Sequence, residues 1–304
     1  MALSIGTVSA KVDNSDALTR ARLRAGLVPD LLVEAQRIAA NVVSGWHGRR
    51  RRGSGDTFWQ FRPYDTGESL TRIDWRRSAR DDSITIRDKE LEAAHTVWVW
   101  ADNSPSMLYQ SSLSEVSKQS RAMVLALALC EVLARSGERV GWPGLTRAIS
   151  SRSAAERVAG ELMGSAGEDT GSFPPLRGMV RRHSLVVISD FLEPISDVLA
   201  RVDAAAQMGV EGILIQISDP AEETFPYSGR TEFRDPETGR KFTAGRAETL
   251  HKDYERLFNA RREVLAEHCK RLGWHHITHR TDQLASSALV AAHMRLSGQV
   301  GGAR

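Results

Sequence analysis

The chain has 304 residues, of which 41% are hydrophobic, enough for one large domain or for a main domain with an appendage. Its 41 basic and 38 acidic residues leave a formal net charge of only +3, which argues for a mixed surface and against a general polyanion-binding protein. The chain contains no run of about 18 uncharged apolar residues, so we expect no membrane insertion.

The cysteines and the N-terminal sequence indicate the compartment. Cys130 and Cys269 each fall in a helical pattern and have no partner cysteine at metal-ligand spacing, which is typical of buried thiols in a reducing compartment. The N-terminus lacks a basic segment followed by an apolar core, so no secretory signal is predicted. We therefore expect a cytoplasmic protein.

Residues 1–95 are expected to hold an N-terminal helix, an arginine-rich loop and a small β element. Apolar residues recur at three- and four-residue steps over residues 19–44, and Pro29 is expected in the first turn of the main helix. Four arginines, Arg49–Arg52, lie in the loop that follows. An arginine-rich loop beside aromatic residues could bind the phosphates of a nucleic acid. Many acidic residues follow it, however, so a structural or partner-facing role is favoured over nucleic-acid binding.

The β element is expected over residues 56–95. Asp65-Thr66-Gly67 is a turn signal, and residues 83–87 alternate between apolar and polar as a strand does. Between them, arginine alternates with aspartate and tryptophan. This alternation suggests a network of bidentate ion pairs, with guanidinium groups stacked on Trp75.

Residues 96–304 are expected to form a doubly wound α/β domain with a mostly parallel sheet, because predicted strands and helices alternate. Strands are predicted at residues 97–101, after residue 137, and at residues 185–189, 213–217 and 274–278. Helices are predicted at residues 116–135, 195–206, 247–272 and 284–296. The first strand is expected to be central, with the strand at residues 185–189 beside it. A hairpin insertion is predicted at about residues 220–245, around Asp235-Pro236-Glu237-Thr238-Gly239.

The strand at residues 97–101 ends in one carboxylate and two hydroxyls at alternating positions, Asp102, Ser104 and Ser106. In an open parallel sheet, ligands bind beyond the carboxyl ends of the strands. Oxygen ligands of this kind suit Mg²⁺, which retains waters and leaves room for a partner carboxylate. Asp190 follows the strand at residues 185–189 in the same way. Either aspartate could instead cap a helix, but two strand-end carboxylates with the same placement favour a metal site.

Three blocks of residues resemble the signature of the bacterial domain-of-unknown-function 58 family. They are Arg62-Pro63-Tyr64-Asp65-Thr66-Gly67-Glu68, Arg72-Ile73-Asp74-Trp75-Arg76-Arg77-Ser78-Ala79-Arg80 and Asp102-Asn103-Ser104-Pro105-Ser106-Met107, in the order and at the separation that the family shows. Glu68 stands where Asp is usual. The signature residues of the first two blocks are Arg62, Tyr64, Gly67, Arg72, Asp74, Trp75 and Arg80. The likeness runs from about residue 31 almost to the C-terminus.

The resemblance has further implications. Proteins of this family are similar to von Willebrand factor A-type domains, and D-x-S-x-S resembles the metal-ion-dependent adhesion site of those domains. This resemblance implies that Asp190 and a threonine in the preceding loop complete the coordination of a Mg²⁺ ion. Thr170 is the candidate for the threonine, and Mn²⁺ or Ca²⁺ are alternatives to Mg²⁺. In von Willebrand domains glycine often follows the second aspartate, whereas Phe191 follows it here. The resemblance also implies a MoxR-type AAA ATPase as a partner.

One function is favoured over two alternatives. The favoured function is a non-enzymatic, Mg²⁺-dependent protein–protein interaction module, which works with the ATPase in the chaperone-like assembly or activation of a client protein. The first alternative is a Mg²⁺-dependent phosphoester hydrolase, which lacks an evident general base or second metal site because only two strand-end carboxylates are visible. The second is nucleic-acid binding through the Arg49–Arg52 loop.

Overall fold

The computed structural model describes residues 15–45, 58–65, 73–80, 83–89, 95–165, 171 and 173–300. The chain divides into two compact units. Residues 1–45 and 95–304 form the larger unit, and residues 46–94 form the smaller one. The N-terminal helix therefore belongs to the same unit as the sheet, although the sequence suggested grouping it with the small β element.

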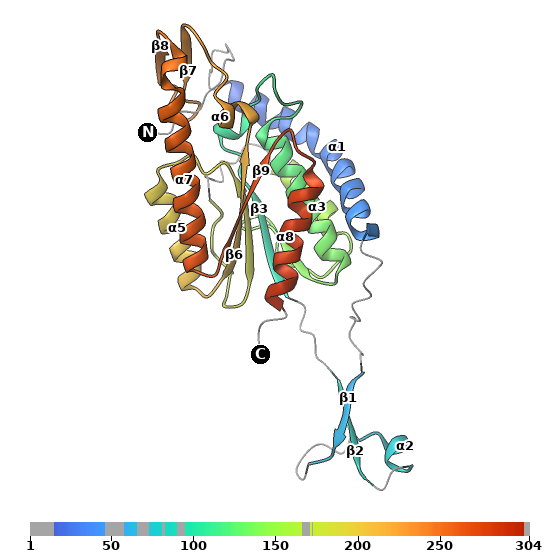
Figure 1. The fold of residues 1–304 in the computed structure, drawn as a ribbon. Helices are drawn as coiled ribbons and strands as arrows, with labels where there is room; N and C mark the ends of the chain where they lie inside the picture. The colour runs from blue at the N-terminus through green and yellow to red at the C-terminus, as the bar shows by residue number, and fades with distance from the viewer. Residues whose placement is uncertain are drawn as a thin grey trace. The chain divides into compact units, whose positions relative to one another are not determined.

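A five-stranded parallel sheet forms the centre of the larger unit (Figure 1). Its strands are β3 (Thr96–Ala101), β4 (Arg139–Gly141), β5 (Ser184–Ser189), β6 (Glu211–Ser218) and β9 (His275–Arg280), in the order β4-β3-β5-β6-β9. Every residue of β3 and β5 is buried, as expected for uninterrupted apolar strands that are covered on both faces. The two strands are neighbours as predicted, but β5, and not β3, occupies the middle of the sheet.

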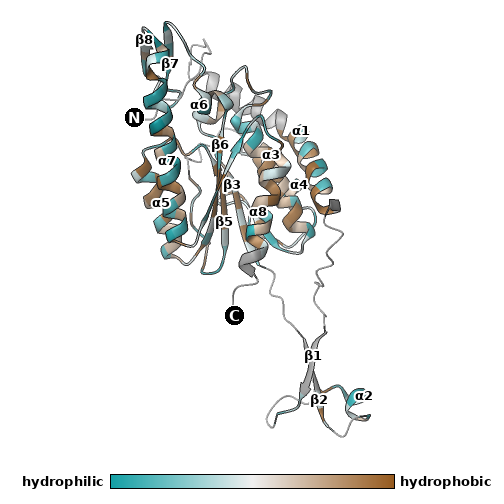
Figure 2. Ribbon diagram, in the orientation of Figure 1, coloured by the Kyte–Doolittle hydropathy of each residue, from teal (hydrophilic) through white to brown (hydrophobic). Residues whose placement is uncertain are grey.

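Helices cover both faces of this sheet, so the unit is a doubly wound α/β domain. On one face lie α3 (Lys118–Arg135) and α8 (Ala285–Val300), and on the other lie α5 (Ile195–Gln207) and α7 (His251–Arg271). Two more helices, α1 (Ser15–Gly45) and α4 (Ala154–Gly164), pack against α3. Apolar residues concentrate in the strands and in the core-facing sides of the helices (Figure 2). No helix in the described part of the chain is long and apolar enough to cross a membrane.

The helix α1 runs unbroken from Ser15 to Gly45 with Pro29 inside it. The expectation that Pro29 opens the main helix is therefore wrong. Proline in a helix interior removes a backbone hydrogen bond and costs about 3 kcal/mol. Val28, Ala35 and Ala39 are buried, and packing of this apolar face offsets the cost because tertiary contacts routinely override local propensity.

The connection between β6 and β9 carries the predicted hairpin. It contains α6 (Pro220–Thr224), the antiparallel strands β7 (Thr231–Arg234) and β8 (Lys241–Ala244), and the short 3-10 helix η3 (Ala247–Leu250). Phe233 of the hairpin is buried and packs against Phe225, which follows α6, and against Tyr227. This aromatic cluster fixes the base of the hairpin to the main domain.

The smaller unit contains the antiparallel strands β1 (Phe58–Pro63) and β2 (Thr85–Lys89) and the short helix α2 (Trp75–Ser78). Asp74 caps α2 by accepting the amide of Arg77 at 3.1 Å. Trp75 is 62% exposed, and the stacking of guanidinium groups on it stays a prediction. Of the signature residues, Gly67 and Arg72 lie outside the described residues.

Candidate metal centre

The carboxyl edge of the sheet has a topological switch point between β3 and β5. The chain runs from β3 to β4 on one side and then to β5 on the other side of β3, which is the 2-1-3-4-5 order of one class of doubly wound sheet. In doubly wound sheets, ligands bind at this point, where the loops after the two strands diverge. Asp102 directly follows β3 and Asp190 directly follows β5. The two aspartates therefore lie at the same edge, as the sequence predicted.

Hydrogen bonds hold both oxygens of the Asp102 carboxylate. Oδ1 accepts the amide of Ser104 at 2.8 Å, and Oδ2 accepts the hydroxyl of Ser189 at 2.7 Å. The side chain is 1% exposed. Burial, and then the negative charge of Asp190, raise the pKa of Asp102 to about 7. The Ser104 amide and the Ser189 hydroxyl are both neutral donors. An ionised Asp102 therefore carries a negative charge that a bound cation would balance.

The two serines of the motif lie beside Asp102. Ser104 caps the short 3-10 helix η2 (Pro105–Leu108), which contains Ser106. Their hydroxyl oxygens are 3.1 Å apart, and Ser106 is buried. The structure thus brings Asp102, Ser104, Ser106 and Asp190 to one edge of the sheet. Thr170, the expected threonine ligand, lies outside the described residues.

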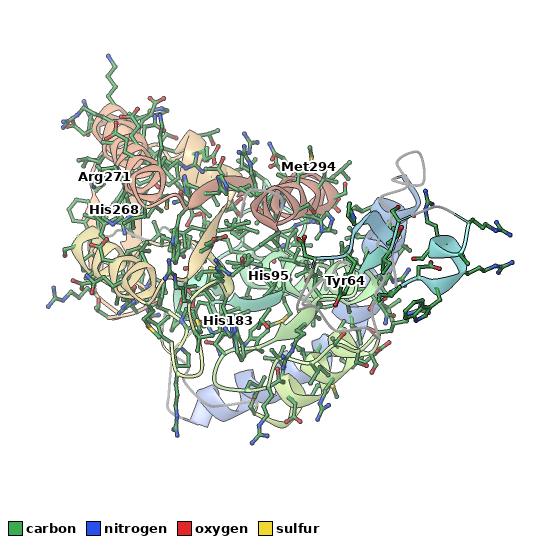
Figure 3. The ribbon with its side chains drawn as sticks, turned by 90° about the horizontal axis from the view of Figure 1, so that it is seen from below. Tyr64, His95, His183, His268, Arg271 and Met294 are labelled. Atoms are coloured by element: carbon green, nitrogen blue, oxygen red, sulfur yellow. The ribbon has the colours of Figure 1, made fainter. Side chains whose placement is uncertain are left out.

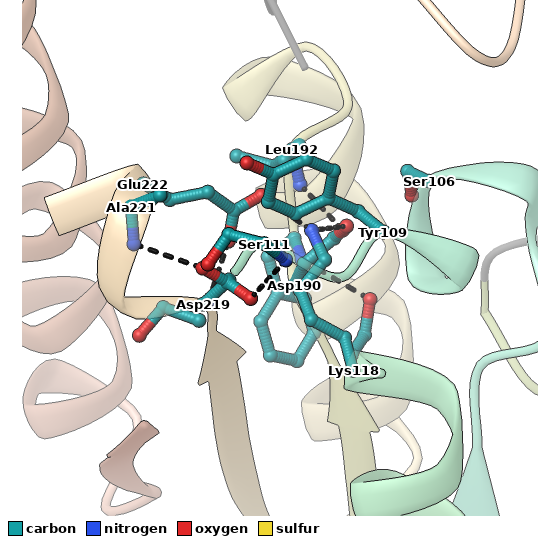
Figure 4. Close-up of polar contacts among 12 residues, drawn as sticks. Ser106, Tyr109, Ser111, Lys118, Asp190, Leu192, Asp219, Ala221 and Glu222 are labelled. Carbon is teal, nitrogen blue, oxygen red and sulfur yellow. Dashed lines mark hydrogen bonds and ion pairs between the residues drawn. The ribbon is translucent and has the colours of Figure 1, made fainter. Parts of the chain in front are cut away.

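A buried lysine that the sequence did not reveal shares this edge. Lys118 begins α3 and is completely buried, and its Nζ lies 2.8 Å from Asp190 Oδ2 and 2.6 Å from Glu222 Oε1 (Figure 4). Burial alone would lower the pKa of Lys118, but the two carboxylates raise it above its ordinary value. The other oxygen of Asp190 accepts the amide of Leu192 at 3.1 Å. Lys118 therefore balances the charge of Asp190 within the protein.

A third carboxylate, Asp219, directly follows β6. Its oxygens accept the amides of Ser111 at 2.9 Å and Ala221 at 2.8 Å, and it forms a capping box with Glu222 at the start of α6. The expectation of only two strand-end carboxylates is therefore wrong. The signal was present in the sequence, because Asp219 ends an apolar run in the same way as Asp102 and Asp190. By accepting the Ser111 amide, Asp219 links the loop after β3 to α6 at this edge of the sheet.

The hairpin brings a further carboxylate to the site. Glu237 lies in the turn between β7 and β8, and its Oε1 accepts the backbone amide of Ser106 at 2.9 Å. Partial burial of the carboxylate raises the pKa of Glu237, and the charge of Asp190 adds to the rise. The two bonded residues are 131 positions apart, so no local pattern in the sequence pairs them.

These donors fit a hard divalent cation. The carboxylates of Asp102 and Asp190 and the hydroxyls of Ser104 and Ser106 are all oxygen ligands, which Mg²⁺ prefers. Among the described residues, no group of three or more histidine, cysteine, aspartate or glutamate side chains is arranged to hold a metal. A cation at this edge would therefore also need the serine hydroxyls and water as ligands, and Mg²⁺ usually keeps several waters.

The amino-terminal edge of the sheet presents a different kind of cluster. His95 and His183, which precede β3 and β5, lie near one another there (Figure 3). His95 Nε2 lies 2.8 Å from the hydroxyl of Ser184, and the indole of Trp98 donates to His183 Nδ1 at 3.0 Å. Burial lowers the pKa of both histidines. These rings are bonded to the strands and support packing, so the carboxyl edge is the better candidate for a site.

Fold and site together define an α/β protein with an acidic, oxygen-rich cluster of side chains at the carboxyl edge of a parallel sheet. Residues 60–264 match the family described as Protein of unknown function DUF58. The chain belongs to this family, which confirms the resemblance read from the sequence.

Similar proteins are known from several bacteria. Uncharacterized protein Rv1480 of Mycobacterium tuberculosis (strain H37Rv) and Uncharacterized protein Mb1516 of Mycobacterium bovis are each 27% identical to this chain over 264 residues, which is 80% of either length. Among solved structures, the conserved hypothetical protein BatB from Bacteroides thetaiotaomicron is 19% identical, with 69% of this chain and all of that chain covered and a TM-score of 0.40. An aerotolerance-related membrane protein from Bacteroides fragilis is 17% identical, with 67% and 100% covered and a TM-score of 0.38.

Proposed function

We propose that this protein is a non-enzymatic, Mg²⁺-dependent protein–protein interaction module. The observation that carries the proposal is the position of Asp102. This buried carboxylate is oriented by the Ser104 amide and the Ser189 hydroxyl, beside the Ser104 and Ser106 hydroxyls, at the switch point of a parallel sheet. An ionised carboxylate in that position is stabilised by a bound cation, which Asp190 helps to hold.

The metal supplies a coordination position that a partner can fill. Because the protein offers few charged ligands, bound Mg²⁺ retains waters, and an acidic side chain of a partner replaces one of them. Asp102, Ser104 and Ser106 hold and orient the cation, and no bond is cleaved. The adhesion-site geometry, the likeness to von Willebrand factor A-type domains and the ligand role of Thr170 all belong to this proposal.

The family resemblance supports the choice of partner. We infer that a MoxR-type AAA ATPase supplies the acidic side chain and that the pair acts on a client protein in the cytoplasm. The two cysteines are free and buried, in keeping with a reducing compartment.

The phosphoester hydrolase is the weaker candidate. Hydrolysis needs a general base or a second metal. Both oxygens of Asp219 accept backbone amides, so these bonds give this third carboxylate a structural role. The nucleic-acid alternative depends on Arg49–Arg52, which lie outside the described residues.

Calorimetric titration with Mg²⁺ tests the metal site. Wild-type protein is expected to bind Mg²⁺, and Asp102→Ala is expected to lose that binding. Asp253→Ala is the matched control, because Asp253 is an exposed aspartate on α7 and is expected to leave binding unchanged. Equal binding by wild type and Asp102→Ala would contradict the proposal.

Co-purification tests the partner. The MoxR-type ATPase is expected to be retained by immobilised wild-type protein in Mg²⁺ and released by a chelator. Phosphatase assays on the purified protein test the hydrolase alternative, and turnover that disappears in Asp102→Ala would favour it over the interaction module.

A further inference from the structure

The hairpin turn touches the motif loop at the point where a partner is expected to bind. Glu237 is exposed at the tip of the hairpin, yet its carboxylate reaches the loop after β3 and accepts the amide of the buried Ser106. A second contact lies nearby: the phenol oxygens of Tyr109, which follows η2, and Tyr227, in the segment before β7, are 2.7 Å apart. The hairpin therefore contacts the motif loop through Glu237, and the segment that leads into the hairpin is linked to the end of η2.

The turn that carries Glu237 is held in one conformation. Asp235 accepts the amide of Glu237 at 2.9 Å and the hydroxyl of Thr238 at 2.6 Å. Gly239 has a φ of +70°, in the left-handed region that favours glycine. At its other end the hairpin is fixed by the buried Phe233. Glu237 is thus presented to the site by a preorganised element.

We propose that Glu237 is a latch, by which we mean a carboxylate of this chain that competes with the acidic residue of the partner for the same position. Its carboxylate occupies the place beside Ser106 that a partner carboxylate takes when the metal is bound, so a partner must displace the tip of the hairpin. This inference rests on the proposed function and adds a regulatory element to the same site.

Glu237 is attached to the site through the hairpin, and this attachment determines which carboxylates it can exclude. A carboxylate attached by a short segment of the chain competes at an effective concentration in the millimolar range. Free carboxylates and weak acidic peptides are therefore excluded. A partner with an acidic side chain and additional contacts to the surrounding surface can still displace Glu237, so the latch selects for an extended protein interface.

Water-proton relaxation with Mn²⁺ as the probe tests the latch, because it reports exchangeable waters on the bound paramagnetic ion. The variants are Glu237→Ala and Glu237→Gln, of which the second keeps an oxygen acceptor for the Ser106 amide and is expected to preserve the fold. Glu232→Gln is the matched control, since Glu232 lies on β7 of the same hairpin and pairs with Lys241 at the surface.

We expect a higher relaxivity per bound Mn²⁺ in both Glu237 variants than in wild type, with the larger rise in Glu237→Ala. Acetate is expected to lower the relaxivity of these variants, because it fills the opened position, and to leave wild type and Glu232→Gln unchanged. Thermal unfolding of every variant verifies that the fold is intact.

The outcomes separate this inference from the proposed function. If all variants bind Mn²⁺ with the relaxivity and acetate response of wild type, the latch is wrong and the metal site stands. Complete loss of Mn²⁺ binding in Glu237→Ala also overturns the latch, because Glu237 would then be an essential ligand. Equal Mn²⁺ binding by wild type and Asp102→Ala, or none by wild type, overturns the proposed function together with the latch.

Discussion

At the level of single residues, the buried ammonium of Lys118 neutralises two buried carboxylates of the site. Removing an ion from water costs several kcal/mol, and attraction between buried partners repays this only when the geometry is good. Lys118 Nζ lies within 2.8 Å of two carboxylates, Asp190 and Glu222. The ammonium thus joins the loop after β5 to α6 and allows both acids to be buried.

Replacing Lys118 with methionine is expected to destabilise the protein by about 3–5 kcal/mol, because it leaves two buried carboxylates without their cation. Unfolding in urea, followed by circular dichroism, measures the change. Lys241→Met is the control, since Lys241 pairs with Glu232 at the surface and its removal is expected to have little effect. A Lys118→Met variant as stable as wild type would show that the ion pair does not support the fold.

The parts of the site that could be predicted from the sequence are those that follow a strand directly. Asp102, Ser104, Ser106 and Asp190 stand at the ends of recognisable apolar runs. Their partners could not be predicted, because Lys118 is 72 positions from Asp190 and 104 from Glu222. Local patterns report the repeat along one element, whereas such pairs depend on how the elements pack.

At the level of elements, β9 lies at the edge of the sheet, and only one of its residues is buried. It contains His275, His276 and His279, and His279 is only 1% exposed. Its Nε2 has no hydrogen-bond partner among the described residues. Burial, and then the positive charge of Arg121, lower the pKa of His279 to about 4.

This lowered pKa predicts acid sensitivity. An unfolded histidine titrates near 6.5, so between that pH and about 4 the unfolded chain binds more protons, and stability falls as the pH falls. The loss is expected to be about 3 kcal/mol. His279→Leu removes this contribution, so its unfolding midpoint should vary less with pH than that of wild type. The stabilities of wild type and His279→Leu are also compared at pH 8, where His279 is neutral. Parallel curves for the two proteins would contradict the assignment.

The position of Pro29 gives a second test at the level of elements. Since α1 continues through Pro29, Pro29→Ala restores a backbone donor and should stabilise the protein by about 1–3 kcal/mol. If the helix instead began at Pro29, the change would be neutral or slightly unfavourable, because proline suits the first helical position. Asp30→Ala, at the exposed neighbouring residue, serves as the control in the same thermal unfolding assay.

At the level of the whole molecule, the fold class followed from the alternation of apolar strands and amphipathic helices, and the parallel sheet confirms it. The helix α4 and the short α6 were not predicted, because their patterns are brief. Neither could the sequence show that α1 packs with the sheet unit, since an apolar face indicates that a helix is buried but does not identify its neighbour.

The proposed metal site couples Mg²⁺ binding to the stability of the entire domain. Without metal, the buried charge of Asp102 lies near that of Asp190, so the neutral Asp102→Asn is expected to unfold at a higher temperature than wild type. A ligand that binds only the folded state stabilises it by about 2.7 kcal/mol at a concentration 100 times its dissociation constant. Saturating Mg²⁺ should therefore raise the unfolding temperature of wild type by several degrees and leave that of Asp102→Asn unchanged.

The order of stability of the two proteins is thus expected to reverse between chelator and excess Mg²⁺. NaCl at matched ionic strength is the necessary comparison, because general salt screening weakens the Asp102–Asp190 repulsion in wild type only and must be separated from Mg²⁺ binding. Asp253→Asn, which removes an exposed carboxylate from α7, should follow wild type in every condition. If Asp102→Asn gains as much from Mg²⁺ as wild type does, the cation binds elsewhere, because the only change between the two proteins is the carboxylate that we assign as its anchor.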